Sequence, residues 1–143
     1  MELRTFSAVL KFTLQLEDQT AKFYQEASLS EKFTRTSQLF AGLANSSRKR
    51  RQALEKAARE SVDHSLLEPI SGLLEESYAT SATFSETVTF ADFLAAANQL
   101  EERAQKFYLE AGERISFIPG VSRLYKRYAQ ERAKASASLQ SLS

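Results

Sequence analysis

The sequence predicts an all-α protein, folded as an antiparallel four-helix bundle made of two repeated helical hairpins with a long crossover between them. Three observations carry this prediction. The 143-residue chain holds four glycines and two prolines, so residues that interrupt helices are scarce. Apolar residues recur at spacings of three and four over long segments, which is typical of amphipathic helices. Two of these segments, residues 6–27 and 90–111, carry nearly the same pattern.

The internal repeat appears when the second segment is shifted back by 84 positions. Each copy carries one glutamate inside its apolar stripe, Glu17 in the first and Glu101 in the second. An isolated buried carboxylate costs several kcal/mol, roughly, unless it is paired, protonated or bound to a metal. The repeat therefore predicts a site at these glutamates without naming an activity. The identical pairs are Phe6 and Phe90, Leu10 and Leu94, Leu16 and Leu100, Glu17 and Glu101, Lys22 and Lys106, Phe23 and Phe107, Tyr24 and Tyr108, Glu26 and Glu110, and Ala27 and Ala111.

The first and third helices have matching start signals. We expect the first over residues 6–28 and the third over residues 90–111, preceded by Thr5 and Thr89. A threonine hydroxyl at this position accepts a hydrogen bond from the free amides of the first turn. The repeat thus extends to the residues that begin each helix.

The second helix is expected over residues 32–59, after a short turn at residues 28–30, and the fourth begins near Val121. Short turns make neighbouring helices antiparallel. Apolar residues of these two helices match at a shift of 85, so the two hairpins are predicted to be equivalent. The matching pairs are Leu39 and Leu124, Phe40 and Tyr125, Leu43 and Tyr128, Ala44 and Ala129, and Leu54 and Leu139.

The connection over residues 61–88 is long enough to cross the whole bundle. It contains Pro69, Gly72 and a run rich in serine and threonine. Apolar residues between Leu66 and Leu74 suggest a short helix inside it. We treat residues 1–143 as one domain, because a chain of this length forms one core more readily than two.

Composition excludes several classes of protein. The 19 basic and 18 acidic residues nearly cancel, which gives no support for a nucleic-acid or anionic-membrane partner. The chain has no cysteine, so disulfides, zinc ribbons, iron–sulfur clusters and thiol catalysis are excluded. No segment approaches the ~20 apolar residues of a membrane span, and the N-terminus lacks a signal-peptide pattern. We expect a soluble, unprocessed, cytoplasmic protein.

Two motifs resemble the rubrerythrin-like branch of the ferritin-like superfamily. They are Leu14-Gln15-Leu16-Glu17 leading to Phe23-Tyr24, and Gln99-Leu100-Glu101 leading to Phe107-Tyr108. In that family the first and third helices each supply a metal-bridging glutamate, with a tyrosine seven residues later. The resemblance implies a ferritin-like bundle in which Glu17 and Glu101 occupy metal-ligand positions beside Tyr24 and Tyr108.

The other ligands of the family are missing from this sequence. The second and fourth helices of the family each supply a Glu-x-x-His pair, whose spacing puts both ligands on one helix face. Here Ser47 and Arg50 stand at the first pair, and Arg132 and Ala135 stand at the second. A slip of one residue offers Glu131 and Lys134, which still lack an imidazole. The single histidine, His64, falls in the crossover.

We therefore predict a site without metal or other cofactor, in which Arg50, Arg132 or both neutralise Glu17 and Glu101. A guanidinium is planar, permanently charged and able to bind carboxylates bidentately, so it can replace a lost metal cation. Tyr24 and Tyr108 are expected to be core residues whose hydroxyls find partners locally. A run of basic residues from Arg48 to Arg51 is interpreted as a solvated face.

The sequence favours a structural or protein-interaction module over an enzyme. No phosphate loop, nucleophile elbow or catalytic triad can be assembled from it. We expect a homodimer or a protein partner, with Phe12, Leu14, Leu29 and Phe117 at the contact.

The alternative is a metal-dependent oxidoreductase or peroxidase of the rubrerythrin type, with di-iron or manganese. Its metal would be held by carboxylates alone, from Glu17, Glu101, Glu131 and Asp18. Carboxylates suit manganese or magnesium better than iron. A small-ligand pocket at the old metal position is a third possibility, which the sequence neither supports nor excludes.

Overall fold

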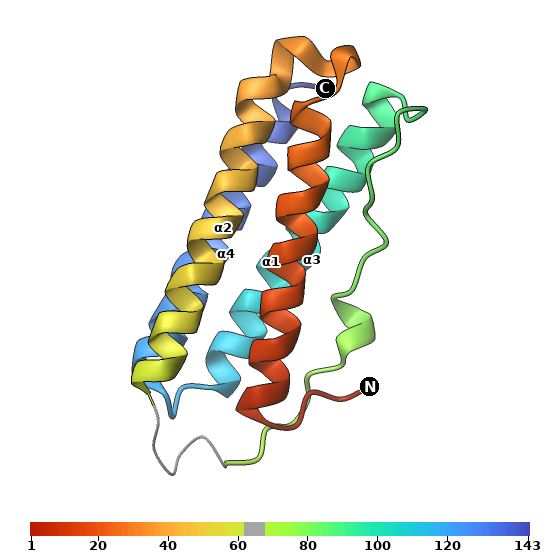
Figure 1. Cartoon of the computed structure of the whole chain (residues 1–143). Helices are drawn as coiled ribbons and strands as arrows, with labels where there is room; N and C mark the ends of the chain where they lie inside the picture. The colour runs from red at the N-terminus through yellow and green to blue at the C-terminus, as the bar shows by residue number, and fades with distance from the viewer. Residues whose placement is uncertain (62–67) are drawn as a thin grey trace.

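The computed structural model describes residues 1–61 and 68–143, and within these residues the protein is a bundle of four α-helices (Figure 1). The helices are α1 (Phe6–Ser28), α2 (Ser37–Glu60), α3 (Phe90–Arg114) and α4 (Pro119–Gln140). Seen in Figure 1, α1 rises, α2 descends, the crossover rises along the bundle, α3 descends and α4 rises. The all-α prediction is confirmed.

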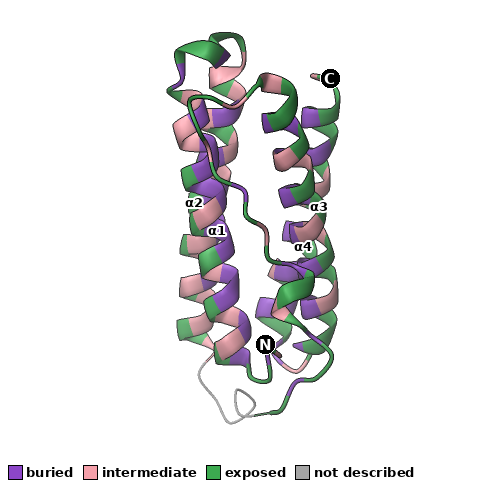
Figure 2. Cartoon of the chain, turned by 90° about the vertical axis from the view of Figure 1, so that its right-hand side faces the viewer, coloured by how far each residue is buried: buried purple, intermediate pink, exposed green. Residues whose placement is uncertain are grey.

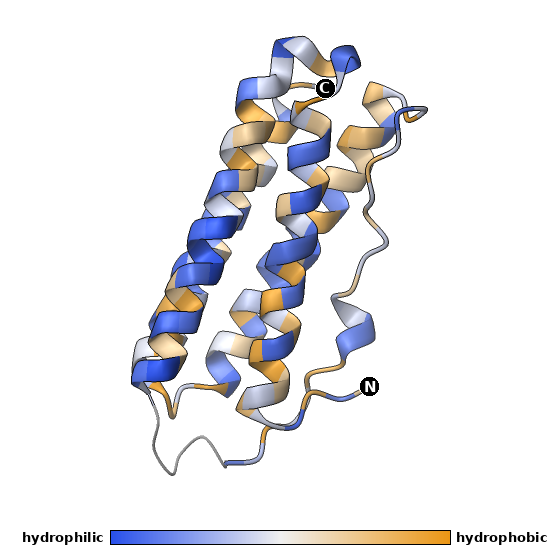
Figure 3. Ribbon diagram, viewed as in Figure 1, coloured by the Kyte–Doolittle hydropathy of each residue, from blue (hydrophilic) through white to orange (hydrophobic). Residues whose placement is uncertain are grey.

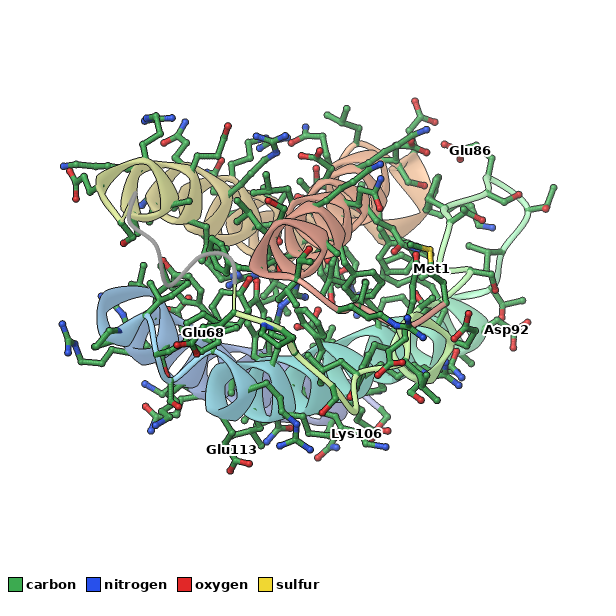
Figure 4. The ribbon with its side chains drawn as sticks, turned by 90° about the horizontal axis from the view of Figure 1, so that it is seen from below. Met1, Glu68, Glu86, Asp92, Lys106 and Glu113 are labelled. Carbon is green, nitrogen blue, oxygen red and sulfur yellow. The ribbon has the colours of Figure 1, made fainter. Side chains whose placement is uncertain are left out.

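The helices pack as two pairs. α1 lies against α2 and α3 lies against α4, so the view along the bundle shows two layers of two helices each (Figure 4). Side chains fill the space between the layers, whereas charged residues such as Lys106 and Glu113 point outward from α3. In the part of the chain that the structure describes, no helix has the length and apolar character needed to span a membrane.

Two of the predicted helix starts are confirmed by their capping bonds. α1 covers the expected residues, and the Thr5 hydroxyl accepts a hydrogen bond from the Ala8 amide at 3.1 Å. The Thr89 hydroxyl accepts one from the Asp92 amide at 3.1 Å. α3 runs three residues beyond its predicted end, to Arg114. α4 begins with Pro119, since proline's missing N–H is not needed in a first turn.

The predicted start of the second helix, at residue 32, is wrong. A 3-10 helix, η1 (Glu31–Thr36), comes first, and its backbone is non-helical at Phe33. Ser30 caps this turn by accepting from the Lys32 amide at 3.2 Å. The Phe33 side chain is buried among other rings, and this burial explains why the chain bends before α2 begins at Ser37.

The predicted apolar stripe of α1 is buried at every position except Leu10, which is half-buried. Buried residues line the inner faces of all four helices (Figure 2). Phe93 is the centre of a group of aromatic rings, with its ring stacked on Phe23 at 4.5 Å between centroids and tilted against Phe40 at 4.9 Å. Further rings around Phe93 belong to Tyr24, Phe33 and Phe84.

The crossover does not form the predicted helix in residues 68–74; Leu66 and Leu67 lie outside the described residues, as does His64. Instead it pairs with the N-terminus in an extended conformation. The Leu3 amide donates to the Leu73 carbonyl and the Ile70 amide donates to the Arg4 carbonyl, both at 2.8 Å. Gly72 has a φ of +84°, a conformation that glycine adopts without strain. One short 3-10 helix follows, η3 (Glu75–Ser77).

The crossover then lies over the side of the bundle formed by α1 and α3, which Figure 2 shows from that side. Gln19 of α1 donates to the Thr80 carbonyl at 3.0 Å, and Arg103 of α3 donates to the Ala79 carbonyl at 2.7 Å. Lys32 donates to the Val88 carbonyl at 2.6 Å, just before α3. Thus α2 and α4 lie on the side away from the crossover.

We expect Phe93→Ala to lower the free energy of unfolding by about 3–5 kcal/mol, because it removes the ring at the centre of the aromatic group. Phe117→Ala is the matched control, since Phe117 is only half-buried. The measurement is urea unfolding followed by circular dichroism. Equal losses from the two substitutions would show that the aromatic group does not stabilise the bundle.

Candidate functional site

Four charged side chains, one from each helix, meet in the middle of the bundle. They are Glu17 of α1, Arg50 of α2, Glu101 of α3 and Arg132 of α4. Their exposed fractions are 1%, 6%, 1% and 0%, respectively. Each lies on the inward stripe of its helix, so the same helical periodicity that buries the apolar residues buries these charges. We call these four residues the arginine–glutamate network.

Arg132 bridges the two glutamates. Its Nη1 donates to both carboxylate oxygens of Glu101 at 3.0 Å, and its Nη2 donates to Oε1 of Glu17 at 3.0 Å. Nη2 also donates to the Thr20 hydroxyl at 3.0 Å. The planar guanidinium thus connects α4 to both α1 and α3 through charge-assisted hydrogen bonds.

Arg50 completes the neutralisation of Glu17 from the other side. Its Nε donates to Oε2 of Glu17 at 3.0 Å, and its Nη1 donates to Oε1 of Glu131 at 3.2 Å. Its Nη2 donates to the buried Ser47 hydroxyl at 3.0 Å. The predicted ion pairs between the glutamates and both arginines are therefore confirmed. Ala135, the fourth replaced position, is buried and contributes no polar side-chain atom.

Both tyrosines are buried, as predicted, but their hydroxyls do not find local partners. Tyr24 donates to Oε2 of Glu101 at 2.7 Å, and Tyr108 donates to Oε2 of Glu17. Seven residues along a helix rise about 10.5 Å, which separates each tyrosine from the glutamate of its own helix. Because α1 and α3 are antiparallel, each tyrosine instead reaches the level of the other helix's glutamate.

The electrostatics of the site favour an ionised Glu17 and neutral phenols. Burial by itself raises the pKa of Glu17, but the charges of Arg132 and Arg50 and the bonds from Arg50 and Tyr108 outweigh it, and the pKa lies below its ordinary value of 4.5. Burial, followed by the neighbouring carboxylate, raises the pKa of Tyr24 and of Tyr108 well above 10.0. At neutral pH Glu17 is therefore a carboxylate, and both phenols keep their protons and donate.

The carboxylate oxygens of this site are fully occupied. Each of the four oxygens of Glu17 and Glu101 accepts at least one hydrogen bond from an arginine, and one oxygen of each glutamate also accepts from a tyrosine. A metal ion bound between Glu17 and Glu101 would have to displace Arg132. Among the described residues, no three or more histidine, cysteine, aspartate or glutamate side chains are grouped as metal ligands.

The structure does not assemble the carboxylate-only set of the alternative hypothesis. Asp18 lies on the surface and pairs with Arg51 at 2.7 Å. Glu131 is one-third exposed, and it binds Arg50 at 3.2 Å and Arg127 at 3.4 Å. These two carboxylates therefore face cations at the edge of the site rather than Glu17 and Glu101.

The predicted contact surface is corrected at Phe12. This residue belongs to the core, with its ring 4.8 Å from that of Phe107. Leu14 and Phe117 are half-buried, and Leu29 is 74% exposed. The buried face of α1 includes Phe12, which lies beside the predicted apolar stripe. Phe12 is buried because the crossover residue Tyr78 packs against it from outside the bundle.

The sequence analysis missed Thr20, which accepts from Arg132. Its hydroxyl donates to the Leu16 carbonyl at 2.8 Å, which leaves an oxygen lone pair free for the guanidinium. The available signal was its position, three residues after Glu17 on the buried stripe. A polar residue at a core position next to a buried charge indicates a hydrogen-bond partner.

Comparison with protein-family models, with curated proteins and with solved structures finds no match. The family resemblance therefore stays a prediction from the two glutamate motifs.

We expect Arg132→Met to lower the free energy of unfolding at pH 7 by about 3–5 kcal/mol, because it leaves two buried carboxylates without their shared cation. Arg127→Met is the matched control, since Arg127 is an exposed arginine of the same helix. Adding Glu17→Gln and Glu101→Gln to Arg132→Met should recover most of the loss. Equal stability of the two single variants would contradict a bridging role for Arg132.

The lowered pKa of Glu17 predicts a defined pH dependence. A carboxylate whose pKa is lower in the folded protein stabilises the fold above its unfolded pKa, about 4.3. This stabilisation is lost as the pH falls through the folded value. Above about pH 5, we expect Glu17→Gln to have a lower free energy of unfolding than the natural protein. The difference in free energy between the two proteins should shrink in more acidic solution. Denaturant unfolding of both proteins between about pH 7 and about pH 3 measures this difference in stability. A difference that does not change with pH would contradict the lowered pKa of Glu17.

Proposed function

We propose that this protein is a ferritin-like, rubrerythrin-like bundle in which the arginine–glutamate network stands in the place of a di-iron centre. We further propose that it acts as a structural or protein-interaction module and not as an oxidoreductase. The observation that carries the proposal is the Arg132 guanidinium, which is fully buried and hydrogen-bonded to both Glu17 and Glu101.

The arrangement of the glutamates and tyrosines supports the family assignment. Glu17 and Tyr24 on α1 mirror Glu101 and Tyr108 on α3, and each tyrosine binds the glutamate of the other helix. Two short connections join α1 to α2 and α3 to α4, and one long crossover runs along the bundle from the end of α2 to the start of α3. Ferritin-like folds have this order of connections. Both features are those that a duplicated hairpin around a shared central site would have.

The contacts of Ser47, Arg50 and Arg132 also support this proposal. Ser47 and Arg50 point into the site from α2, and Arg132 points into it from α4. Two monovalent guanidinium groups therefore supply positive charge where metal ions would supply it in the family. Arginine is suited to this role because it stays protonated in buried sites and binds two acceptors in one plane.

The chemistry of the network favours a structural role. A guanidinium stays protonated near neutral pH, and burial and the neighbouring carboxylate raise the pKa of Tyr24 and of Tyr108 well above 10.0. The arginines and these two tyrosines are therefore poorly suited to general acid–base catalysis near pH 7. The contacts of the network join all four helices, so its main effect is to specify which side chains meet at the centre.

The interaction function would then belong to the outer surface of the bundle. The expected homodimer or protein partner is part of this proposal. Of the four apolar residues at the predicted contact, only Leu29 is exposed, whereas Phe12 is buried and Leu14 and Phe117 are half-buried. These four residues therefore do not form one exposed apolar face, and we look for the partner-binding face elsewhere on the bundle.

Metal content tests the proposal. The natural chain, purified without chelator and then offered ferrous iron or Mn²⁺ without oxygen, should contain no metal above background by elemental mass spectrometry. A variant carrying Ser47→Glu, Arg50→His, Arg132→Glu and Ala135→His restores both Glu-x-x-His pairs. It should bind about two metal ions per chain.

Two outcomes would contradict the proposal. About two metals in the natural chain would restore the oxidoreductase hypothesis. A folded four-substitution variant that binds no metal would show that these positions do not correspond to the ligands of the family. Circular dichroism of both proteins establishes that the bundle is intact in each comparison.

A further inference from the structure

A cleft of about 520 Å³ lies between α2 and α4, on the side of the bundle away from the crossover. Within residues 68–88, the hydrogen bonds of the crossover that involve side chains join it to the N-terminal segment, α1, η1 with its capping residue Ser30, and α3, and none of them reaches α2 or α4. The lining residues from α2 are Leu43, Ser46, Lys49, Arg50 and Ala53, and those from α4 are Leu124, Arg127, Tyr128, Glu131, Lys134, Ala135 and Ser138.

The cleft is elongated along the helices. Its lining extends from Leu43 to Ala53 on α2, which corresponds to about 15 Å of helix, and from Leu124 to Ser138 on α4, about 21 Å. Three to four turns of another helix fit this length. A compact ligand such as a nucleotide would leave much of the cleft empty.

The cleft has an apolar floor and a basic rim. Leu43, Ala53 and Leu124 are half-buried in it. Lys49 and Lys134 stand exposed at its edges. Within residues 1–61 and 68–143, neither of these lysines forms an ion pair with a carboxylate. An apolar floor between basic edges is complementary to an amphipathic surface with acidic flanks.

The basic residues of the whole chain are concentrated on the two helices that form the cleft. α2 and α4 hold 11 of the 19 basic residues of the chain but only three of its 18 acidic residues. Figure 3 shows the resulting hydrophilic tract along the lower part of α2. Without the buried Arg50 and Arg132, α2 and α4 still carry nine basic residues against three acidic ones. This excess of positive charge steers acidic partners toward these two helices.

From these observations we propose that the α2–α4 cleft is the docking site for an acidic amphipathic helix of a partner protein. This inference rests on the proposed interaction function and names its partner class. Apolar side chains at positions i, i+3 or i+4, and i+7 of the partner lie on the floor. Glutamates or aspartates beside that stripe face Lys49 and Lys134.

Arg50 connects the arginine–glutamate network to the cleft. It lines the cleft, and its guanidinium is held in place by bonds to Glu17, Glu131 and the Ser47 hydroxyl. Glu131 is itself one-third exposed and shared with Arg127. The network then serves as the rigid support of the docking site.

Single-stranded nucleic acid fits the cleft less well. Sequence-tolerant binding of single strands depends on aromatic rings that stack on bases. Tyr128 is the aromatic residue of the lining, and it is 4% exposed. The basic rim therefore favours carboxylates on an apolar ridge over stacked bases.

Fluorescence anisotropy with a labelled designed peptide tests this inference. The probe is a helix of about 15 residues with leucine at i, i+4, i+7 and i+11 and glutamate on both flanks of that stripe. A scrambled peptide of the same composition and a single-stranded RNA of similar length are the comparison probes. We expect the amphipathic peptide to bind at least about tenfold more tightly than either one.

Charge-reversal variants locate the binding. Lys49→Glu with Lys134→Glu should raise the Kd of the amphipathic peptide at least about tenfold. Lys22→Glu with Lys106→Glu makes the same change in net charge on α1 and α3 and should leave the Kd nearly unchanged. Leu124→Gln, which removes an apolar side chain from the floor, should also weaken binding. The three proteins are compared at equal helicity by circular dichroism.

Failure to bind the amphipathic peptide, equal binding of the scrambled peptide, or tighter binding of the RNA would overturn the proposed partner. Light scattering of the protein without peptide tests whether a second copy of the chain occupies the cleft. A dimer that Lys49→Glu with Lys134→Glu abolishes would show that a second copy of the chain fills the cleft. The metal measurement does not involve Lys49 or Lys134. The proposed docking site can therefore be contradicted without contradicting the metal-free network, and the reverse also holds.

Discussion

The structure depends on the buried guanidinium of Arg132. Among the described residues it is the one side chain that binds both central glutamates, and through Glu17, Thr20 and Glu101 it connects α4 to α1 and α3. Removing charged groups from water is costly, so a buried Arg132 without its carboxylates would destabilise the fold. The helical stripes that bury the apolar residues also bring Glu17 and Glu101 within reach of Arg132, and these contacts specify which residues of α1, α3 and α4 meet at the centre.

This constraint separates the two sides of the bundle. On the α1–α3 side, the crossover covers the seam and is held by Gln19, Arg103 and Arg114. On the α2–α4 side the described part of the crossover does not cover the seam, and Lys49 and Lys134 line the cleft there. Arg50 belongs to both the buried network and this open seam. The proposed functions of the network as support and of the cleft as docking site are linked through this residue.

Much of the fold could be predicted from periodicity, because the inward stripe of α1 and its repeat in α3 dictate which faces are buried. The ion pairs of Glu17 and Glu101 followed from the same stripe together with the arginines at replaced ligand positions. Four features could not be predicted. The crossed bonds of Tyr24 and Tyr108 depend on the relative heights of α1 and α3, and the extended pairing of residues 68–74 depends on contact with the N-terminus. The late start of α2 depends on the burial of Phe33, and the basic cleft is hidden in a composition that sums to near neutrality.

The central claim is that a guanidinium occupies the position of a metal, and anomalous X-ray scattering from crystals soaked in Mn²⁺ tests it most directly. The account predicts density for the Arg132 guanidinium between Glu17 and Glu101, with no anomalous peak at these carboxylates. An anomalous peak bonded to both glutamates, with Arg132 displaced from the bundle axis, would contradict it.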